Sequence, residues 1–212
     1  MKRKIGVLGG TFDPIHNGHI IIAHEAQKKL GLEKVLFMPA GNPYMKDGMK
    51  VSPASLRYEM VRLGLNGEKD FELCDLEIHM CGDTHTAETM ALLAWQYSDA
   101  ELYFIMGWDN LEKFHTWVDP EIILQYCAII AFPRVGYAVP DPTKLYIQLP
   151  ELEGKLTVLN KPFVDISASL IRERVAANLP LNYLLTSPVA SFINKHHLYE
   201  TGDIGVSGVC PE

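Results

Sequence analysis

Short apolar runs alternate along this chain with longer segments in which apolar residues recur every three or four positions. A short apolar run bounded by glycine, proline or polar residues is typical of a buried strand. The predicted strands are residues 4–8, 35–38, 71–78, 102–106, 127–132 and 156–159. Residues 127–132 form the most continuous run, as expected of a parallel strand that is covered on both faces.

The intervening segments carry the spacing of amphipathic helices. After Gly18, the apolar residues Ile22, Ala26 and Leu30 share one face, and Gly31 follows as a stop signal. The other predicted helices are residues 90–97, 167–177 and 187–196, one with Ser52 as N-cap and Pro53 as its first residue, and one that begins at Asp119-Pro120-Glu121.

The order of these elements predicts an α/β fold. We expect a doubly wound, Rossmann-like, mostly parallel sheet with helices on both faces and further helices at the C-terminus, in a single domain over residues 1–200. The first strand, glycine loop, helix and second strand form a βαβ unit with a right-handed crossover. Residues 41–52 have the composition of a mobile loop, and residues 201–212 are expected to be a disordered tail.

Composition and charge narrow the range of partners. The chain has 212 residues, of which 48% are hydrophobic and 21% are charged, which is typical of a folded globular protein. Lys and Arg number 19 against 26 Asp and Glu, so the net charge is −7. This acidic balance argues against a nucleic acid or a membrane surface as the partner, because both select basic proteins.

The N-terminus and the cysteines favour a cytoplasmic protein. Met-Lys-Arg-Lys is followed by too short an apolar run for a signal peptide, and no run approaches the roughly 18 residues of a membrane span. Cys74, Cys81, Cys127 and Cys210 form no C-x-x-C pair, so reduced thiols are expected.

The stretch GGTFDPIHNGH, residues 9–19, lies between the first strand and the first helix, where open α/β sheets bind ligands. The glycines allow close approach of a ligand, and the helix N-terminus offers free N–H groups to an anion. His16 and His19 both reach this point and can donate to phosphate oxygens. The stretch contains neither a dinucleotide-binding G-x-G-x-x-G nor a Walker A motif. The alternative interpretation is a glycine-rich turn with two solvated histidines.

Two motifs resemble the signatures of a known family. Residues 10–14 followed by His16-x-Gly18-His19 resemble the first signature of the H-x-G-H nucleotidyltransferase superfamily, and residues 166–172 (ISASLIR) resemble its second. The sequence between them is most similar to the bacterial nicotinate mononucleotide adenylyltransferases. That similarity lies in Asn42-Pro43-x-x-Lys46, Gly107-Trp108-Asp109 and Thr116-Trp117, and the resemblance covers residues 4–199.

The resemblance implies a nucleotidyltransferase domain and a role in NAD biosynthesis. AMP would pass from ATP to the 5′-phosphate of nicotinate mononucleotide, giving the deamido-NAD dinucleotide and pyrophosphate. A phosphate monoester carries about −1.5 to −2 charge at pH 7, so this nucleophile needs no general base. Catalysis then depends on positioning and electrostatics. The partners would be ATP and a pyridine mononucleotide, with Mg²⁺ carried by ATP and held by phosphate oxygens and water. Homo-oligomerisation is left open.

The resemblance also assigns roles to individual residues. His16, His19, Lys46 and Arg172 would act on the ATP phosphates, with His19 nearest the transferred one. ATP would further be bound by Gly10, Thr11, Phe12, Gly18, Asp109, Ile166 and Ser167, with Asp109 accepting from ribose hydroxyls. For the acceptor, Trp117 would stack on the pyridine ring and Thr86 would receive the nicotinate carboxylate.

Departures from the family pattern concentrate in the acceptor half of the site, at Thr84-His85, Tyr44-Met45, Trp108 and Val118. Nicotinamide mononucleotide or another phosphorylated acceptor therefore stays open, as do a CTP-dependent cytidylyltransferase and a non-catalytic nucleotide sensor. Three alternatives concern single residues. Trp117 could be a core residue, and Asp109 could be the N-cap of residues 110–114. Cys74, His79, Cys81 and His85 suggest zinc, but their spacing fits no standard site, and no metal ligands are expected.

Overall fold

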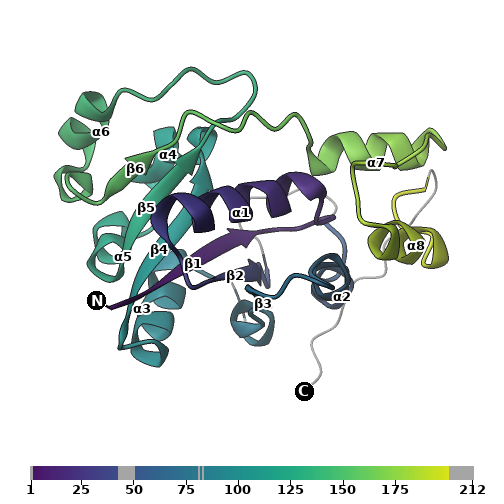
Figure 1. Ribbon diagram of the computed structural model, residues 1–212, viewed down its shortest axis with the longest axis horizontal. Coiled ribbons are helices and arrows are strands. Elements are labelled where there is room, and N and C mark those ends of the chain that lie inside the picture. The colour runs from purple at the N-terminus through teal and green to yellow at the C-terminus, as the bar shows by residue number, and fades with distance from the viewer. Residues whose placement is uncertain (1, 43–50, 81, 83, 201–212) are drawn as a thin grey trace.

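The computed structural model describes residues 2–42, 51–80, 82 and 84–200, and within them six strands form one parallel sheet (Figure 1). The strands are β1 (Arg3–Gly10), β2 (Lys34–Pro39), β3 (Phe71–Leu73), β4 (Ala100–Gly107), β5 (Cys127–Phe132) and β6 (Leu156–Val158). Their order in the sheet is β3-β2-β1-β4-β5-β6, and every neighbouring pair is parallel. The sheet is therefore parallel throughout the described chain, rather than mostly parallel.

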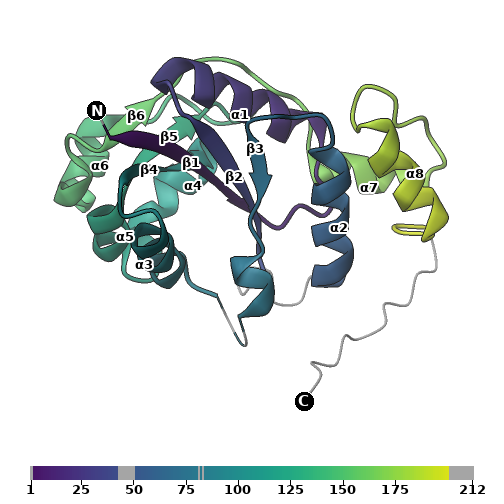
Figure 2. The same ribbon diagram turned by 60° about the horizontal axis from the view of Figure 1, so that its bottom comes forward.

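Helices cover both faces of the sheet, as the alternation of elements predicts (Figures 1 and 2). The helices are α1 (Asn17–Leu30), α2 (Ala54–Gly64), α3 (Thr86–Gln96), α4 (Trp108–Lys113), α5 (Pro120–Tyr126), α6 (Pro142–Gln148), α7 (Ala168–Ala176) and α8 (Ser187–Lys195). Buried residues of α3, α4, α5 and α6 form one core cluster with the sheet, and those of α1, α2, α7 and α8 form the other. The doubly wound, Rossmann-like fold is thus confirmed.

Strand order reverses next to β1, and this reversal creates a crevice. The chain moves outward from β1 through β2 to β3, then returns to place β4 on the other side of β1. The carboxyl ends of β1 and β4 lie side by side, with Leu8 paired with Ile105. Parallel α/β sheets bind ligands at such a switch point. The loop from β1 to α1 and the start of α4 both lie there, and α7 and α8 lie beyond the carboxyl end of β1 (Figure 2).

Helix α1 has the boundaries that its sequence predicts. His16 is the N-cap in an extended conformation, and Gly31 ends the helix with a φ of 65°. Gly31 donates its N–H to the carbonyl of Gln27, and the left-handed conformation suits a residue without a Cβ. The first turn of α1 contains no acidic residue. The positive end of the helix dipole is therefore available to a ligand.

Some predicted boundaries are wrong. β3 ends at Leu73, and Leu76–His79 form a 3-10 turn in place of the second half of the predicted strand 71–78. The turn places the Glu77 carboxylate in the core, where it accepts hydrogen bonds from Thr84 (3.2 Å) and Thr89 (2.9 Å). Pro53 is the N-cap of α2 rather than its first residue.

Other expectations concern short or undescribed segments. The seven residues of α6 are too few for a periodic pattern, and no helix is predicted there from sequence. The proposed mobile loop 41–52 lies largely outside the described residues, and so does the predicted tail 201–212. Within the described chain, no helix combines the length and the apolar character that a membrane crossing requires.

Candidate active site

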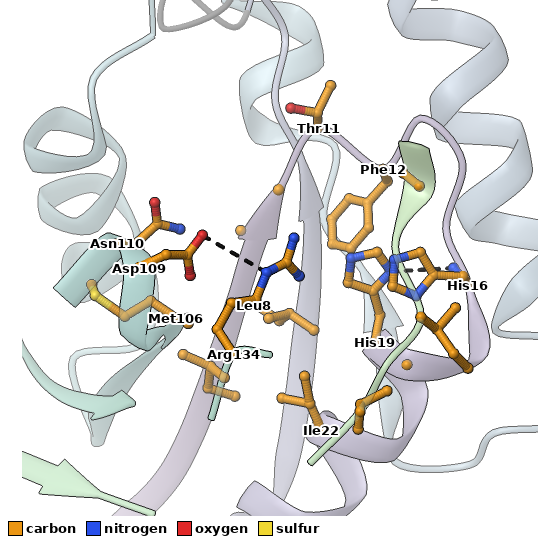
Figure 3. Close-up of a pocket in the computed structure, with 18 of the residues that line it drawn as sticks. Leu8, Thr11, Phe12, His16, His19, Ile22, Met106, Asp109, Asn110 and Arg134 are labelled. Carbon is orange, nitrogen blue, oxygen red and sulfur yellow. Dashed lines mark hydrogen bonds and ion pairs between the residues drawn. The ribbon is translucent and has the colours of Figure 1, made fainter. Parts of the chain in front are cut away.

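A cavity of about 290 Å³ opens at the switch point between β1 and β4 (Figure 3). Most residues predicted to bind ATP, together with one predicted to bind the acceptor, line this cavity. They are Gly10, Thr11, Phe12, His16, Gly18, His19, Asp109, Trp117 and Ile166. Three remote parts of the chain thus supply the lining: the loop after β1, the start of α4, and the segment before α7.

The two histidines form a stacked pair at the start of α1. Their ring centroids are 3.6 Å apart with an interplanar angle of 22°. The backbone N–H of His16 donates to Nδ1 of His19 at 3.2 Å. Because Nδ1 of a neutral ring then accepts, the His19 proton is assigned to Nε2, which can donate to a ligand. The edge of Phe12 packs against the His19 ring at a centroid distance of 4.9 Å.

Gly18 is required by this packing. A Cβ at position 18 would lie 2.9 Å from both Nδ1 of His16 and Cγ1 of Val164. Real Cβ contacts of this length are essentially absent, so any larger residue would displace the His16 ring. The glycine of the H-x-G-H motif therefore keeps the histidine pair in place.

Both rings are neutral at physiological pH. Burial, reinforced by the nearby cation of Arg134, lowers the pKa of His16 to about 3. Burial also lowers the pKa of His19 well below its ordinary value, with smaller contributions from His16 and Arg134. The pair therefore offers hydrogen bonds without formal charge. The first turn of α1 adds backbone N–H groups and its dipole beside them.

Arg134 supplies the positive charge that sequence analysis did not assign. It follows the carboxyl end of β5, and Figure 3 shows it reaching into the cavity between Asp109 and the histidine pair. Its Nε lies 4.0 Å from Oδ2 of Asp109. Its position directly after a predicted strand was the signal that could have identified it. Asn110, beside Asp109, is a second lining residue that was missed.

Asp109 lies inside α4 and points into the cavity (Figure 3). The N-cap of α4 is Gly107, so the alternative of Asp109 as an N-cap is wrong. A Cβ on Gly107 would collide with the Asp109 carboxylate. Gly107 therefore leaves the space that this carboxylate occupies.

The acceptor half of the site is less complete. The Trp117 indole lines the cavity while packing edge-on against Phe104 and Phe114, so the residue belongs to both site and core. Among the described residues, its buried Nε1 has no hydrogen-bond partner. Thr86 is the first residue of α3 and does not line the cavity. Trp108 is a core residue, only 1% exposed.

Other predicted residues lie beside the cavity or outside the description. Arg172 donates from Nη1 to the carbonyl of Asp13 (2.7 Å) and from Nη2 to Oγ of Ser169 (3.1 Å). Ser167 is the N-cap of α7, with its Oγ accepting from the N–H of Leu170 at 3.2 Å. Lys46 lies outside the described residues.

The described residues contain no cluster of three or more His, Cys, Asp and Glu side chains placed to hold a metal ion. Of the four residues considered for zinc, Cys81 lies outside the described part of the chain, and His79 pairs with Asp75 at 3.3 Å. Near the cavity, the Asp13 carboxylate accepts from the Tyr199 hydroxyl (2.6 Å) and from the N–H of Ser52 (3.1 Å). The Asp109 carboxylate faces Arg134.

A stacked histidine pair at a helix N-terminus, at the switch point of a parallel sheet, defines a nucleotide-phosphate-binding α/β protein. The sequence profile of the cytidylyltransferase-like family matches residues 7–174. The chain belongs to this family and, within it, to the nicotinate-nucleotide adenylyltransferases, so the predicted enzyme class of nucleotidyltransferase is confirmed.

Relatives support this placement along nearly the whole chain. A "Probable nicotinate-nucleotide adenylyltransferase" of Dehalococcoides mccartyi (strain ATCC BAA-2266 / KCTC 15142 / 195) is 45% identical over 197 residues, covering 92% of this chain and 97% of that protein. One of Clostridium novyi (strain NT) is 36% identical over 201 residues, covering 94% and 100%. The fold resembles that of Plasmodium falciparum nicotinic acid mononucleotide adenylyltransferase complexed with NaAD, with a TM-score of 0.77 at 19% identity, covering 93% of this chain and 97% of that one.

Proposed function

We propose that the protein transfers AMP from ATP to the 5′-phosphate of nicotinate mononucleotide, giving the deamido-NAD dinucleotide and pyrophosphate. The observation that carries this proposal is the stacked His16–His19 pair at the start of α1, within a cavity lined by Asp109 and Trp117. The 45% identity over 92% of the chain supports nicotinate mononucleotide as the acceptor.

The chemistry suits the groups that the cavity presents. An oxygen of the acceptor's 5′-phosphate attacks the α-phosphorus of ATP, the bond from that phosphorus to the bridging oxygen breaks, and pyrophosphate leaves with the bond electrons. Charge grows on the bridging and pyrophosphate oxygens, so donors fixed in advance lower the barrier. Nε2 of His19 and the N–H groups of the first turn of α1 are such donors, and Arg134 adds a cation.

The remaining roles are proposals of the same kind. The backbone at Gly10, Thr11, Phe12 and Gly18 would contact phosphate oxygens, with Ile166 against the nucleotide. Asp109 would accept from the ribose hydroxyls, and Trp117 would stack on the pyridine ring.

Arg172 and Lys46 would reach the triphosphate from outside the described lining, Ser167 would contact adenine, and Thr86 would bind the nicotinate carboxylate. Arg172 already contacts the backbone of the loop after β1, through the Asp13 carbonyl.

Mg²⁺ is proposed to enter with ATP and to be held by phosphate oxygens and water. The carboxylates nearest the cavity fit this view. Asp13 is engaged by Tyr199 and Ser52, and Asp109 faces Arg134, so neither is set up as part of a dedicated protein cage. The metal would neutralise charge on the leaving pyrophosphate.

Pyrophosphate release by the purified protein with ATP and Mg²⁺ tests the proposal. Three acceptors would be compared: nicotinate mononucleotide, nicotinamide mononucleotide and phosphopantetheine. CTP in place of ATP would test the nucleotide donor. We expect the highest kcat/KM with ATP and nicotinate mononucleotide. A preference for another acceptor or for CTP would contradict the substrate assignment, and no release with any pair would contradict catalysis itself.

A further inference from the structure

A buried arginine outside the cavity connects the loop after β1 to two other segments. Arg57 lies on α2 and is 1% exposed. Its Nε donates to the carbonyl of Ser52 at 2.9 Å, and its Nη1 and Nη2 donate to the carbonyls of Thr11 and Gly41 at 2.8 Å each. Three stretches of chain that are remote in sequence therefore meet at one guanidinium group.

A space-filling role does not account for this side chain. Removing a guanidinium from water costs free energy that an apolar side chain of similar size does not incur. Burial lowers the pKa of Arg57, while the nearby Asp13, Tyr199 and Glu77 act in the opposite direction. An arginine stays protonated in proteins and presents its donors in a rigid planar fork. Arg57 is thus a buried cation whose donors have fixed directions.

The contact with Thr11 sets the direction of a peptide at the cavity wall. The Thr11–Phe12 peptide is trans, so its C=O and N–H point in opposite directions. Its carbonyl points to Arg57 in the core. The N–H of Phe12 is therefore directed away from Arg57, toward the cavity that Thr11 and Phe12 line.

The backbone at Phe12 needs such support. Its φ is 50°, in the left-handed region that residues with a Cβ rarely adopt. Backbone of this kind persists where its surroundings hold it. Arg57 holds the loop directly through Thr11, and indirectly through Ser52, whose own N–H donates to the Asp13 carboxylate at 3.1 Å.

We propose that Arg57 is a positioning residue for adenylyl transfer: it fixes the Thr11–Phe12 peptide so that the Phe12 N–H is presented to a phosphate in the cavity. Arg57 acts through the backbone and does not touch the substrate. A donor fixed in advance stabilises the charge that develops on phosphate oxygens without reorganising during the reaction. The inference rests on the proposed function only in requiring a nucleotide phosphate at this loop.

Two substitutions and a matched control test the proposal. Arg57→Met removes every donor while retaining a long apolar side chain, and Arg57→Lys retains the charge without the planar fork. Arg62→Met is the control, since Arg62 lies on the same helix, is exposed, and pairs with Glu59. Turnover would be measured per folded molecule, with the folded fraction from circular dichroism. Pyrophosphate affinity would be measured by calorimetry.

We expect Arg57→Met to lower kcat per folded molecule by roughly 10- to 100-fold and to weaken pyrophosphate binding by about tenfold. Arg57→Lys should give an intermediate loss, and Arg62→Met should match the wild type. A purely structural role would reduce the folded fraction while kcat and pyrophosphate affinity per folded molecule stay at wild-type values, and that result overturns the proposal.

Two further cases are covered by the design. If Arg57→Met does not fold, Arg57→Lys decides by the same two measurements. Pyrophosphate binding involves no acceptor nucleotide, so an error in the proposed acceptor would leave the affinity test unaffected. Loss of turnover with unchanged pyrophosphate affinity in both variants would also contradict the proposal, because the Phe12 N–H would then not contact a phosphate.

Discussion

The two histidines at the start of α1 differ from surface histidines in their burial and in their charge state. Stacking at 3.6 Å and the shared Arg134 cation hold both rings neutral in the free cavity. A neutral imidazole donates one hydrogen bond and introduces no ion that must be dehydrated before a polyanion binds. The H-x-G-H spacing therefore builds a site for directed donors rather than a positive charge.

His19→Ala should abolish most of the turnover with little effect on stability. The substitution removes the Nε2 donor that faces the reacting phosphate and leaves the helix in place. The loss of one such donor lowers kcat by about 100- to 1000-fold. Steady-state pyrophosphate release and urea unfolding would measure the two effects. His24→Ala on the same helix is the control, since His24 is exposed and pairs with Glu68 at 3.0 Å. Near wild-type turnover in His19→Ala would refute the role of His19.

The buried His16 ring should make the protein less stable in acid. Its pKa is about 3 when folded, whereas an unfolded histidine binds a proton below about pH 6.5. Between these values the unfolded state holds more protons, so the free energy of unfolding falls as the pH falls, by up to about 1.4 kcal/mol per pH unit. Urea unfolding at pH 7.5, 6 and 5 should show a shallower decline for His16→Asn than for the wild type. Parallel declines would be the contrary result.

At the scale of elements, the C-terminal part of the chain braces the β1–α1 loop. The N–H of Asn17 donates to the carbonyl of Leu184 at 2.9 Å, and its side-chain amide donates to the carbonyl of Tyr183 at 2.8 Å. Arg172 of α7 and Tyr199 after α8 both bind Asp13. The elements after β6 therefore complete the site by holding its loop.

Tyr199→Phe tests this bracing. The substitution removes the 2.6 Å hydrogen bond to the Asp13 carboxylate, which is 3% exposed. A buried carboxylate that loses a donor costs roughly 1–3 kcal/mol of stability. The free energy of unfolding from urea titration measures the loss, with the exposed Tyr183→Phe as control. A change as small as that of the control would show that the Tyr199 hydroxyl does not stabilise the loop.

Sequence periodicity predicts the elements whose apolar pattern is complete within the element. Cys127–Phe132 matches its predicted strand, and α1 ends at Gly31 as its stop signal indicates. The pattern fails where a tertiary contact overrides it, as at residues 76–79, where the buried Glu77 is held by Thr84 and Thr89. Periodicity cannot identify such a contact because the partners belong to other segments.

At the scale of the whole molecule, the candidate site shows the same division. His16, Gly18, His19 and Asp109 belong to local motifs, and the structure places them in one cavity. Arg134 and Arg57 belong to no recognisable motif. Arg134 becomes visible once β5 is aligned beside β4, and Arg57 once α2 packs beneath the loop after β1. Residues that act through tertiary packing are therefore the ones that sequence analysis misses.

The net charge of −7 bears on the same distinction, since the cavity of an acidic protein must bind a polyanion through nearby groups. Arg134→Gln and Arg62→Gln each take the net charge from −7 to −8, but only Arg134 lines the cavity. We expect Arg134→Gln to raise the KM for ATP by roughly 5- to 50-fold, because a charge-assisted contact to phosphate is lost. Arg62→Gln should leave the KM unchanged, since its charge lies on the exposed face of α2 and is screened by solvent. Steady-state kinetics at 0.15 M salt would measure both values. Equal increases in the two variants would mean that the overall charge, rather than the Arg134 guanidinium, governs ATP binding.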